Sequence, residues 1–594
     1  MSTPEVKQSA SGKVWNLRET DATVVADLAR VQQVPEIVAK CLAGRGITMD
    51  TAQSFLHPTL REQFPDPSSF ADMDKAVDLI LQALEQKTKI TVFADYDVDG
   101  ATSSAQLRRW LRQMGSEAGL YVPDRLTEGY GPSAAAFQKI ADTGTKLVIT
   151  VDCGAVSVAA ITAAKKIGLT VIVLDHHLMG QGVMPPADAL VNPNREDDNS
   201  GCGYLAAAGL VFVLLAALNR KARESGCFKN KAEPNLLELL ELAALGTVCD
   251  VASLQAFNRV LVAQGLKAMT NLHTPGLAAF AEITEIEPPF STYHAGFVFG
   301  PRINAGGRIG KSDLGARLLA SDDPAECLEI AAELDRLNIE RKDIEKQVQD
   351  EAMQQVEDHL LDDAVLVVAG RGWHPGVIGI VAGRIKDKYN RPSIVIALGE
   401  DGIGHGSGRS ISGVNLGDAF SAAVQAGVLQ KGGGHAMAGG LTMDVEQLDP
   451  FRQFLLAEIG EQAKAAGQHK KLWIDAVAGL HGVGLDLAKN LSLAEPFGMG
   501  NPEPVLMFKD VFIGYSQELN GGHVRCTFET EIGDASVSAI CFRASDRGLA
   551  TILLEHSGAP VHVAGKLRVD RWKGREKVSF QIEDVAWAEE NTEF

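Results

Sequence analysis

The sequence predicts an α/β protein with two α/β domains, joined by a long helix and followed by a β-barrel. Three observations predict this fold class. Apolar strands alternate with helical segments between residues 89 and 174, and again between residues 364 and 397. Residues 323–362 hold one proline and set apolar residues among alternating charges, which is typical of a long helix. From about residue 470 short strand-like runs dominate, which favours a small barrel.

The first region contains buried strands separated by helices. We expect strands at residues 89–94, 147–151 and 169–174, with helices at residues 102–114 and 157–167 between them. Continuous apolar strands of this kind indicate a parallel sheet that is covered on both faces. Ligands of open parallel sheets bind beyond the carboxyl ends of the strands. We therefore expect the functional residues at that edge.

The second α/β region is smaller. We expect strands at residues 364–369 and 392–397 and a helix at residues 376–388, followed by glycine-rich segments at residues 404–410 and 432–440. The chain length favours several domains. The expected parts are an N-terminal extension (1–70), a first α/β domain (71–320), the connecting helix (321–362), a second α/β domain (363–465) and a barrel domain (466–594).

Composition limits the possible functions. The chain has 594 residues, of which 45% are hydrophobic, enough for several packed cores. A formal net charge of −20 argues against a surface that coats nucleic acid throughout, but it allows a local basic channel. The eight cysteines lack metal-type spacing, which indicates a reducing compartment. The N-terminus lacks an apolar signal core, and the longest apolar run, residues 204–218, is shorter than the roughly 20 residues of a membrane helix.

Acidic and imidazole side chains follow all three strands of the first region. The first strand is followed by Asp-Tyr-Asp-Val-Asp-Gly (95–100), the second by Asp152 and the third by Asp-His-His (175–177). Such groups repel one another or stay unpaired unless cations join them. The cluster that we expect to bind cations comprises Asp97, Asp99, Asp152, His176 and Asp250.

Two divalent ions fit this set. Oxygen-rich ligands with one imidazole suit Mn²⁺ or Mg²⁺ better than zinc. Two ions about 3.5–4 Å apart that share a carboxylate are common in phosphoryl hydrolysis, and the central Asp152 is the expected bridge. A lone aspartate at a strand end is more often a cap or turn former, and a lone histidine pair is more often packed or solvated. Three acid-bearing strand ends together favour the metal site.

Four motifs resemble, in order and context, the signature motifs of the DHH phosphoesterase family. They are DYDVDG (95–100), VDCG (151–154), DHH (175–177) and TVCD (247–250). The segment GGGHAMAGG (432–440) resembles the glycine-rich motif of the companion DHHA1 domain. Further motifs narrow the resemblance to the bacterial single-strand-specific 5′ exonucleases of this family; they are EGYG (128–131), GPRINAGGR (300–308), WHPGVIGIVA (373–382) and SGRS (407–410).

The resemblance implies an enzyme that releases 5′ mononucleotides from single-stranded DNA in the 5′-to-3′ direction, with two Mn²⁺ or Mg²⁺ ions, in DNA repair and recombination. It implies the five ligands named above, with Asp152 contacting both ions and His177 facing the scissile phosphate. Smaller phosphatases of the family carry a histidine at the position of Phe93. The first metal site therefore lacks a ligand here, and we expect Asp95 to compensate only indirectly.

Two glycine-rich segments carry candidate phosphate contacts. Arg302, Asn304 and Arg308 lie in an expected glycine-rich turn, and a planar guanidinium suits bidentate phosphate binding. The alternative is a structural arginine that ties the long helix to the first domain. Residues 406–410, which end at Ser410, offer backbone N–H groups, hydroxyls and a guanidinium for an anion-binding nest. The glycines of this segment can equally serve a tight turn.

The resemblance assigns roles to several of these residues. It implies that Arg125, Ser407 and Arg409 bind the 5′ terminal phosphate, which makes the enzyme end-directed. It also implies that His374 and His435 approach substrate phosphates. By itself, His435 among glycines is more simply interpreted as a core histidine.

The C-terminal region carries a basic stretch. Residues 566–577 contain six basic residues around one tryptophan, with two opposing acids. Basic residues beside an aromatic ring suit a single strand, and a solvated charged hairpin is the alternative. The resemblance places an OB fold here, which with the two α/β domains encloses a channel that admits one strand and excludes duplex. The expected contacts are Arg571, Trp572, Lys573 and Arg575.

The resemblance further implies a cytoplasmic monomer that works with a helicase and a single-strand-binding protein, without a membrane. Two other functions stay open. One is a DHH phosphodiesterase that acts on short RNA or signalling dinucleotides; such relatives are shorter and lack the C-terminal barrel. The other is a metal-free DNA-binding scaffold, against which the intact ligand positions count.

Overall fold

The computed structural model describes residue 6 and residues 8–588, except residues 126, 181, 183, 468–469, 556–557 and 573–574, and the side chains of 571–575. The chain divides into two compact units. Unit A comprises Pro58–Gln347 and Pro496–Asn501. Unit B comprises Met1–His57, Val348–Glu495 and Pro502–Phe594.

Unit A is built on a five-stranded parallel sheet of order β3-β2-β4-β5-β6. Its strands are β2 (Ile90–Ala94), β3 (Gly119–Tyr121), β4 (Leu147–Val151), β5 (Thr170–Leu174) and β6 (Ala189–Val191). All residues of β2 and β4 are buried, as their apolar runs predict. The three expected strands are therefore confirmed, and β3 and β6 were not expected.

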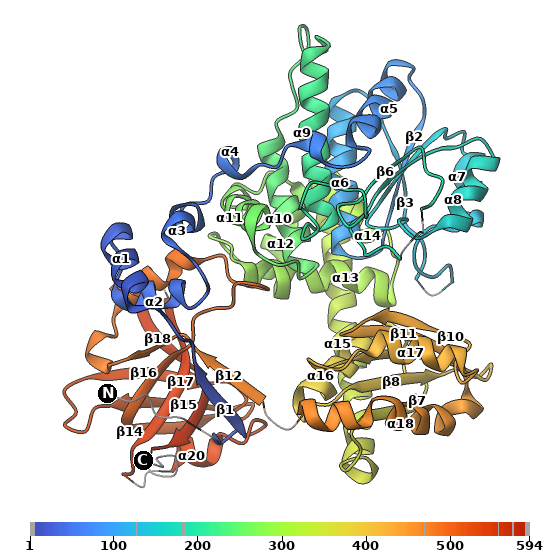
Figure 1. The fold of residues 1–594 in the computed structure, drawn as a ribbon. Coiled ribbons are helices and arrows are strands. Elements are labelled where there is room, and N and C mark those ends of the chain that lie inside the picture. Colours follow the sequence, from blue (N-terminus) through green and yellow to red (C-terminus); the bar gives the residue numbers. More distant parts are fainter. Residues whose placement is uncertain are drawn as a thin grey trace. The chain divides into compact units, whose positions relative to one another are not determined.

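Helices cover both faces of this sheet (Figure 1). Helix α6 (Val98–Gln113) packs on one face through Trp110, in the same core cluster as Ile90. Helices α7 (Ala134–Asp142) and α8 (Val158–Lys166) pack on the other face. Because the strands carry apolar side chains on both faces of the sheet, both faces need to be covered by helices.

The rest of unit A is helical. Its further helices are α4 (Leu60–Gln63), α5 (Met73–Glu85), α9 (Ala207–Glu224), α10 (Leu240–Cys249), α11 (Ala256–Met269), α12 (Pro275–Thr284), α13 (Gly300–Ile309) and α14 (Leu314–Ala320). The expected turn at residues 300–308 is thus a helix. Its Gly307 serves close packing, because a Cβ there would lie 2.8 Å from the carbonyl oxygen of Tyr96. Among the described residues, no helix has the length and apolar character needed to span a bilayer.

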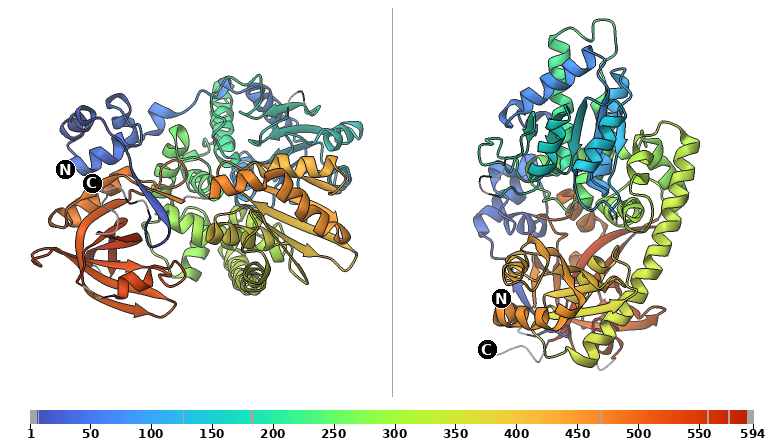
Figure 2. Two further views of the ribbon diagram at one scale, coloured as in Figure 1. Left: turned by 60° about the horizontal axis from the view of Figure 1, so that its bottom comes forward. Right: turned by 90° about the vertical axis from the view of Figure 1, so that its right-hand side faces the viewer.

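One long helix leaves unit A. Helix α15 (Pro324–His359) has 36 residues and confirms the connecting helix that its charge pattern predicts. Figure 2 shows it as the long yellow-green helix.

The first part of unit B is a second α/β domain with a sheet of order β10-β11-β9-β8-β7. Its elements are β7 (Leu366–Arg371), α16 (Ile378–Tyr389), β8 (Ser393–Leu398), β9 (Ile403–Arg409), α17 (Leu416–Gln425), β10 (Lys431–His435), β11 (Ala438–Asp444) and α18 (Leu448–Gly467). The glycine-rich segments are therefore strands. A Cβ at Gly408 would overlap Leu416 and Phe420, so the glycine lets α17 pack closely on β9.

The second part is a β-barrel of order β13-β14-β15-β16-β18-β17, which a β14–β17 pairing closes. Its elements are β13 (Ala476–Ala478), α19 (Leu485–Leu491), β14 (Leu506–Leu519), β15 (His523–Glu529), β16 (Ser536–Cys541), α20 (Ala550–Leu554), β17 (Val561–Trp572) and β18 (Arg575–Trp587). In β15 buried residues alternate with less buried ones, as a closed barrel requires. The expected barrel is confirmed.

The N-terminal residues belong to both units. Strand β1 (Lys13–Leu17) pairs in parallel with β12 (Lys470–Ile474), just before the barrel. Helices α1 (Ala22–Gln32), α2 (Glu36–Ala43) and α3 (Met49–Leu56) follow β1 in unit B. Sequence patterns alone did not place this segment, because its strand partner lies more than 450 positions away.

Candidate metal centre

The first acids are fixed where β2 meets α6. Asp97 is the N-cap of α6, and its Oδ1 accepts hydrogen bonds from the N–H groups of Asp99 (2.9 Å) and Gly100 (3.1 Å). A Cβ at residue 100 would overlap the carbonyl oxygen of Asp95. Glycine at this position therefore lets the helix start close to the strand end, which brings the acids of DYDVDG together.

Asp99 is held by a second helix. Its two carboxylate oxygens accept hydrogen bonds from the N–H groups of Ala207 (2.7 Å) and Ala208 (2.8 Å), the first residues of α9. These N–H groups have no partner within their own helix, and the helix terminus stabilises negative charge. The side chain is 1% exposed, so Asp99 has a fixed orientation.

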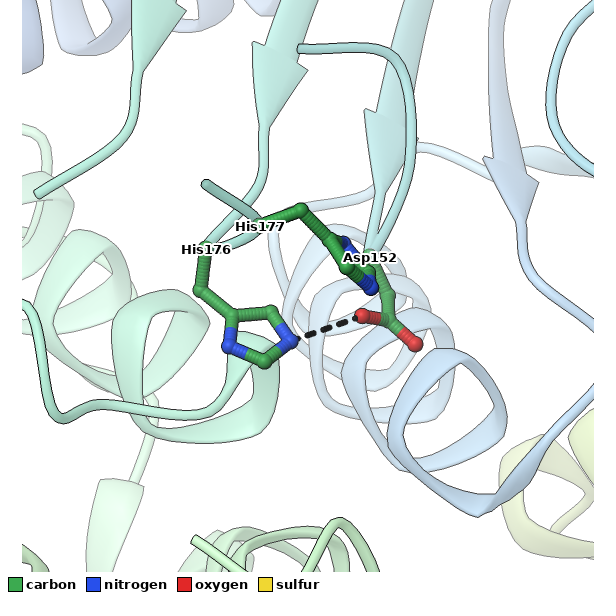
Figure 3. Close-up of side chains that lie close together, drawn as sticks. All are labelled: Asp152, His176 and His177. Carbon is green, nitrogen blue, oxygen red and sulfur yellow. Dashed lines mark ion pairs between the residues drawn. The ribbon is translucent and has the colours of Figure 1, made fainter. Parts of the chain in front are cut away.

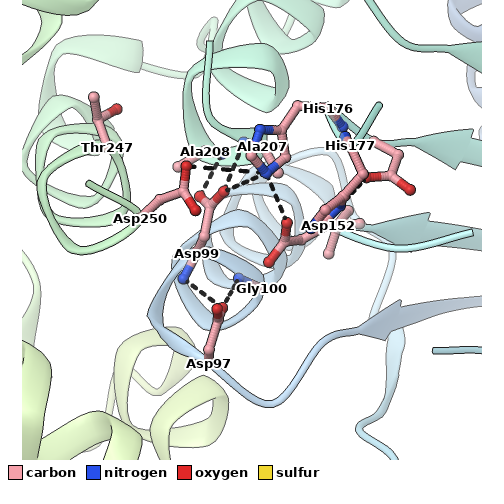
Figure 4. A network of polar contacts seen from close by, with 12 residues as sticks. Asp97, Asp99, Gly100, Asp152, His176, His177, Ala207, Ala208, Thr247 and Asp250 are labelled. Carbon is pink, nitrogen blue, oxygen red and sulfur yellow. Dashed lines mark hydrogen bonds and ion pairs between the residues drawn. The ribbon is translucent and has the colours of Figure 1, made fainter. Parts of the chain in front are cut away.

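Three acids surround one imidazole (Figure 4), and Asp152 is the nearest of them (Figure 3). Asp152 follows β4 with a positive φ of 62°, a conformation that aspartate tolerates better than most residues. His176 Nε2 lies 3.2 Å from Asp152 Oδ1, 3.7 Å from Asp99 Oδ2 and 4.0 Å from Asp250 Oδ2. Asp250 directly follows α10. The expected cluster of Asp97, Asp99, Asp152, His176 and Asp250 thus assembles at one edge of the sheet.

Asp175 has a different role from the other acids, because it orients the DHH segment. Its carboxylate accepts hydrogen bonds from the N–H groups of Ala155 (2.8 Å), His176 (2.8 Å) and His177 (3.2 Å). The His177 Nδ1 lies 2.7 Å from its Oδ1, so Nδ1–H donates to this acid. Burial raises the pKa of Asp175, but the hydrogen bonds from His177 and the backbone outweigh it and lower the pKa.

The sequence analysis missed three residues that complete the support of the histidines. Asn194 donates to the carbonyl oxygen of His176 (2.5 Å), and Asn192 donates to that of His177 (2.9 Å). The Tyr130 hydroxyl lies 3.3 Å from His177 Nε2. The asparagines follow β6, a fourth strand end with polar residues that was a usable signal in the sequence.

Burial and mutual repulsion shift the pKa values of the acids in this cluster. Burial, followed by the charges of neighbouring acids, raises the pKa of Asp95, Asp99 and Asp152 above the usual value, and that of Asp250 to about 7. Burial and the nearby His177 lower the pKa of His176 to about 4, so His176 is the neutral imidazole that a metal requires.

The donor set fits divalent cations. Ligand atoms within 4.8 Å of one another form the groups Asp99–His176–Asp250, Asp95–Asp97–Asp152 and Asp152–His176–His177. Asp152 and His176 each belong to two of them, and of the two only the carboxylate of Asp152 has two oxygens to share between ions. Asp152 Oδ1, Asp95 Oδ1 and His176 Nε2 are buried without a hydrogen-bond partner, which costs about 1–3 kcal/mol each. Bound Mn²⁺ or Mg²⁺ removes this cost, because these ions prefer such oxygen-rich ligands.

The arginine of α13 has a structural role. Arg302 Nε donates to Asp335 Oδ1 of α15 at 2.8 Å, and its Nη1 donates to the carbonyl oxygen of Val298 at 2.8 Å. This agrees with the alternative of an arginine that ties the long helix to the first domain, and it counts against phosphate binding. Asn304 and Arg308 lie half-buried on the same helix. Arg125 stacks over the ring of Tyr96, beside the acids, at 5.2 Å.

The predicted anion nest at residues 406–410 is wrong. Strand β9 lies between β8 and β11, so its backbone N–H groups bond to the neighbouring strands. Ser410 is buried, and its hydroxyl donates to the carbonyl oxygen of Val414 at 2.8 Å. The side chains of Ser407 and Arg409 do meet, with Nη1 donating to Oγ at 3.2 Å. They lie against Gly379, where a Cβ would be 2.9 Å from Ser407 Oγ and 3.1 Å from Arg409 Nη2.

The two histidines of the second domain are not core residues. His435 is exposed at the end of β10, so its interpretation as a core histidine is wrong. His374 Nδ1 accepts a hydrogen bond from the N–H of Gly376 at 3.0 Å, in the turn that precedes α16. Their approach to substrate phosphates stays a prediction.

The described residues of the basic stretch at 566–577 lie in β17 and β18, and two of its basic side chains are neutralised. Lys566 pairs with Glu583 at 2.9 Å, and Arg568 pairs with Glu503 at 2.5 Å. The side chains of Arg571, Trp572 and Arg575, and all of Lys573, lie outside the described part of the structure. Strand binding by this hairpin stays a prediction.

Comparison with family models agrees with this architecture. The DHH family N-terminal domain matches residues 89–247, the DHHA1 domain matches residues 362–461, and the RecJ OB domain matches residues 474–584. A solved structure of RecJ from Thermus thermophilus in complex with Mn²⁺ has a TM-score of 0.80 and 27% identity, covering 96% of this chain and 79% of that one. A structure of the same protein with Mg²⁺ has a TM-score of 0.74 and 26% identity, covering 96% and 78%.

The fold and the acid-histidine cluster define a metal-binding phosphoesterase of the DHH class. Similar proteins of known function identify the family within this class. The single-stranded-DNA-specific exonuclease RecJ of Dickeya dadantii is 36% identical and covers 93% of this chain and 96% of its own length. RecJ of Escherichia coli is 34% identical, with 96% and 98% covered, and RecJ of Bacillus subtilis is 33% identical, with 98% and 72% covered. The chain belongs to the RecJ family.

Proposed function

We propose that this chain is a metal-dependent exonuclease that degrades single-stranded DNA. The observation that carries the proposal is the pair of ligand groups that share Asp152, at the carboxyl edge of a DHH-type sheet. Relatives over 30% identical along most of the chain are named single-stranded-DNA-specific exonucleases. A two-metal centre hydrolyses phosphodiesters, which is the reaction that this name describes.

Different residues of the chain are assigned to the two ions. When bound, the ions supply Lewis acidity and an activated water nucleophile. Asp99, His176 and Asp250 would hold one ion, Asp97 would contribute to the other, and Asp152 lies within reach of both sets of residues. The contacts to the substrate are then made by residues that neighbour these ligands.

His177 is the residue that we assign to the scissile phosphate. Asp175 fixes its Nδ1–H, so we assign Nε2, which lies 3.3 Å from the Tyr130 hydroxyl, to the substrate. Burial lowers the pKa of His177, but the hydrogen bond to Asp175 and the nearby carboxylates outweigh it and raise the pKa to about 9. At neutral pH the charged imidazole donates to a phosphate oxygen and stabilises the charge that develops there.

We further propose that degradation starts at the 5′ end and releases mononucleotides. Ser407 and Arg409 lie against the first turn of α16, where a guanidinium and a helix terminus both favour an anion. We assign the terminal phosphate of the strand to Ser407 and Arg409, and we keep Arg125 as a separate candidate phosphate contact. We also assign the enzyme to DNA repair and recombination in the cytoplasm, as a monomer with a helicase and a single-strand-binding protein as partners.

The test is digestion of an oligonucleotide labelled at either end, as a single strand and as duplex, with Mn²⁺, Mg²⁺ or chelator. We expect 5′ mononucleotides from the single strand only, and only with metal. The Asp152→Ala variant should bind the strand but not cut it. Intact long strands together with cleaved dinucleotides would identify a dinucleotide phosphodiesterase. Strand binding by the wild type without cleavage under any condition would identify a scaffold.

A further inference from the structure

A tight turn from a distant part of the sequence packs in the same unit as the metal centre. Residues 498–501, the 498–501 turn, form it. The N–H of Gly498 donates to the carbonyl oxygen of Asn501 at 2.9 Å, and the N–H of Asn501 donates back to Gly498 at 3.1 Å. Gly500 has a φ of 76°, which a turn with a left-handed third residue requires. The turn lies in the region that matches the RecJ OB domain, yet it belongs to unit A.

This turn contacts the 251–255 loop, which follows the last acid of the metal centre. The N–H of Leu254 donates to the carbonyl oxygen of Met499 at 2.7 Å. A Cβ at Gly500 would lie 2.3 Å from Ser253 Oγ and 3.5 Å from the Leu254 nitrogen. Glycine at this position therefore lets the turn pack directly on the backbone of the loop.

Two buried side chains fix the turn in this place. The carbonyl oxygen of Pro496 accepts hydrogen bonds from Asn501 Nδ2 at 2.8 Å and from Arg259 Nη1 at 3.4 Å. Asn501 is 2% exposed, and Arg259, which lies on α11, is 3% exposed. The amide of Asn501 closes the turn on itself, and the guanidinium of Arg259 ties it to the helix that follows the loop.

The backbone at Val251 shows why the loop needs this support. Val251 directly follows Asp250 at the end of α10, and its φ of 59° lies in a region that β-branched residues rarely adopt. A strained conformation of this kind persists only where neighbouring contacts impose it. The next N–H, of Ala252, closes the helix end by donating to the carbonyl oxygen of Thr247 at 3.2 Å. The direction in which the Asp250 side chain leaves the helix therefore depends on the contacts that hold the loop.

We propose that the 498–501 turn is a positioning element for Asp250, and that Asn501 is the residue that keeps it in place. The turn holds the 251–255 loop, the loop keeps the backbone of Val251 in its left-handed conformation, and this backbone places the Asp250 carboxylate 4.0 Å from His176 Nε2. The inference rests on the proposed function, because it concerns an acid of the proposed metal centre.

The segment that carries the turn continues into the barrel. Glu503 lies two residues after the turn and pairs with Arg568 of β17 at 2.5 Å. The barrel domain thus contributes to the metal centre without supplying a ligand, through a turn that holds the end of α10.

The first experiment measures Mn²⁺ binding to the metal-free Asn501→Ala variant of the full chain by calorimetric titration. The ion assigned to Asp250 should bind about 10-fold more weakly, as is typical when a residue that orients a ligand is lost. The other ion should bind as in the wild type. Asn501→Asp keeps the size of the side chain and removes the amide donor, so it should show the same selective loss. Wild-type affinities for both ions in both variants would overturn the proposal.

The matched control is Asn219→Ala. Asn219 lies on α9 and is 4% exposed, and its Nδ2 also donates to a proline carbonyl oxygen, that of Pro234, at 2.9 Å. Thermal melts should show lower stability for this variant, and both Mn²⁺ affinities should stay at the wild-type level. A loss of Mn²⁺ affinity equal to that of Asn501→Ala would mean that any lost buried amide weakens the site, and it would overturn the specific role of the turn.

Two combined variants test whether the turn acts through this loop. Glycine adopts a positive φ without strain, so adding Val251→Gly to Asn501→Ala should restore part of the lost Mn²⁺ affinity. In the Asp250→Asn background, Asn501→Ala should weaken Mn²⁺ binding no further, because the side chain that it positions is already changed. An affinity that Val251→Gly leaves unrestored, or a further 10-fold loss in the second background, would overturn the proposal. Two ions bound by the wild type without digestion of DNA would sink the proposed function and leave the role of the turn standing.

Discussion

Neutralising one acid of the metal centre should stabilise the metal-free protein. In Asp250→Asn the perturbation removes a charge whose pKa rises from the ordinary 3.8 to about 7, first through burial and then through Asp97. A pKa raised on folding makes the carboxylate destabilising at every pH above its ordinary pKa, fully so above pH 7. A shift of about 3 units corresponds to about 4 kcal/mol. Because the side chain is 25% exposed and can relax toward water, we expect about 2 kcal/mol.

The assay is thermal unfolding at pH 8, with chelator and with saturating Mn²⁺. With chelator the variant should melt about 4 °C above the wild type, from roughly 2 °C per kcal/mol for a large domain. With Mn²⁺ the order should reverse, because the wild type gains the binding energy of both ions and the variant has lost a ligand. The control is Asp175→Asn, which should destabilise under both conditions, because hydrogen bonds lower the pKa of Asp175.

The outcome that refutes this reasoning is a metal-free Asp250→Asn variant that melts at or below the wild type. It would mean that neither burial nor the neighbouring Asp97 makes the Asp250 carboxylate unfavourable in the folded protein. A Mn²⁺-induced increase in melting temperature equal to that of the wild type would separately remove Asp250 from the ligands.

Three further predictions follow from the packing. Gly100→Ala should destabilise the folded protein by about 1–3 kcal/mol and weaken Mn²⁺ binding, because the added Cβ overlaps the backbone of Asp95. Thermal melts and calorimetric titration measure the two effects. A melting temperature and a Mn²⁺ affinity equal to those of the wild type would contradict this prediction. Arg302→Ala should lower the free energy of unfolding by about 1–3 kcal/mol, because the hydrogen bond to Asp335 is lost. The salt dependence of single-strand binding should stay unchanged. A weaker dependence of binding on salt concentration would show that Arg302 contacts a phosphate. Arg409→Ala should remove the preference for 5′-phosphorylated strands, and equal loss of activity on unphosphorylated strands would contradict end recognition.

The strands and the cluster were predictable because both depend on local pattern. The apolar run at residues 147–151 between two helical segments is typical of a buried parallel strand, and an acid directly after such a strand lies at the ligand-binding edge. The role of Arg302 was not decidable from sequence, since its partner Asp335 lies 33 positions away on another helix. The glycines of β9 were expected in a loop, because no local signal tells a flexible glycine from one that makes room for α17.

The hydrogen-bond partners of the acids in DYDVDG were also hidden from the sequence. DYDVDG contains three acids at alternate positions, and their spacing does not say which oxygens are already engaged by backbone N–H groups. The structure separates them, since Asp97 and Asp99 accept backbone bonds and Asp95 Oδ1 has no hydrogen-bond partner. This difference depends on the start of α6 and of α9, which the motif does not encode.

The most direct test of the central claim is the anomalous diffraction of Mn²⁺ in crystals of this chain. The account predicts two peaks about 3.5–4 Å apart, with Asp152 bound to both, one peak beside Asp97, and the other beside Asp99, His176 and Asp250. A single peak, or two peaks that do not share Asp152, would contradict the two-metal centre on which the proposed nuclease activity depends.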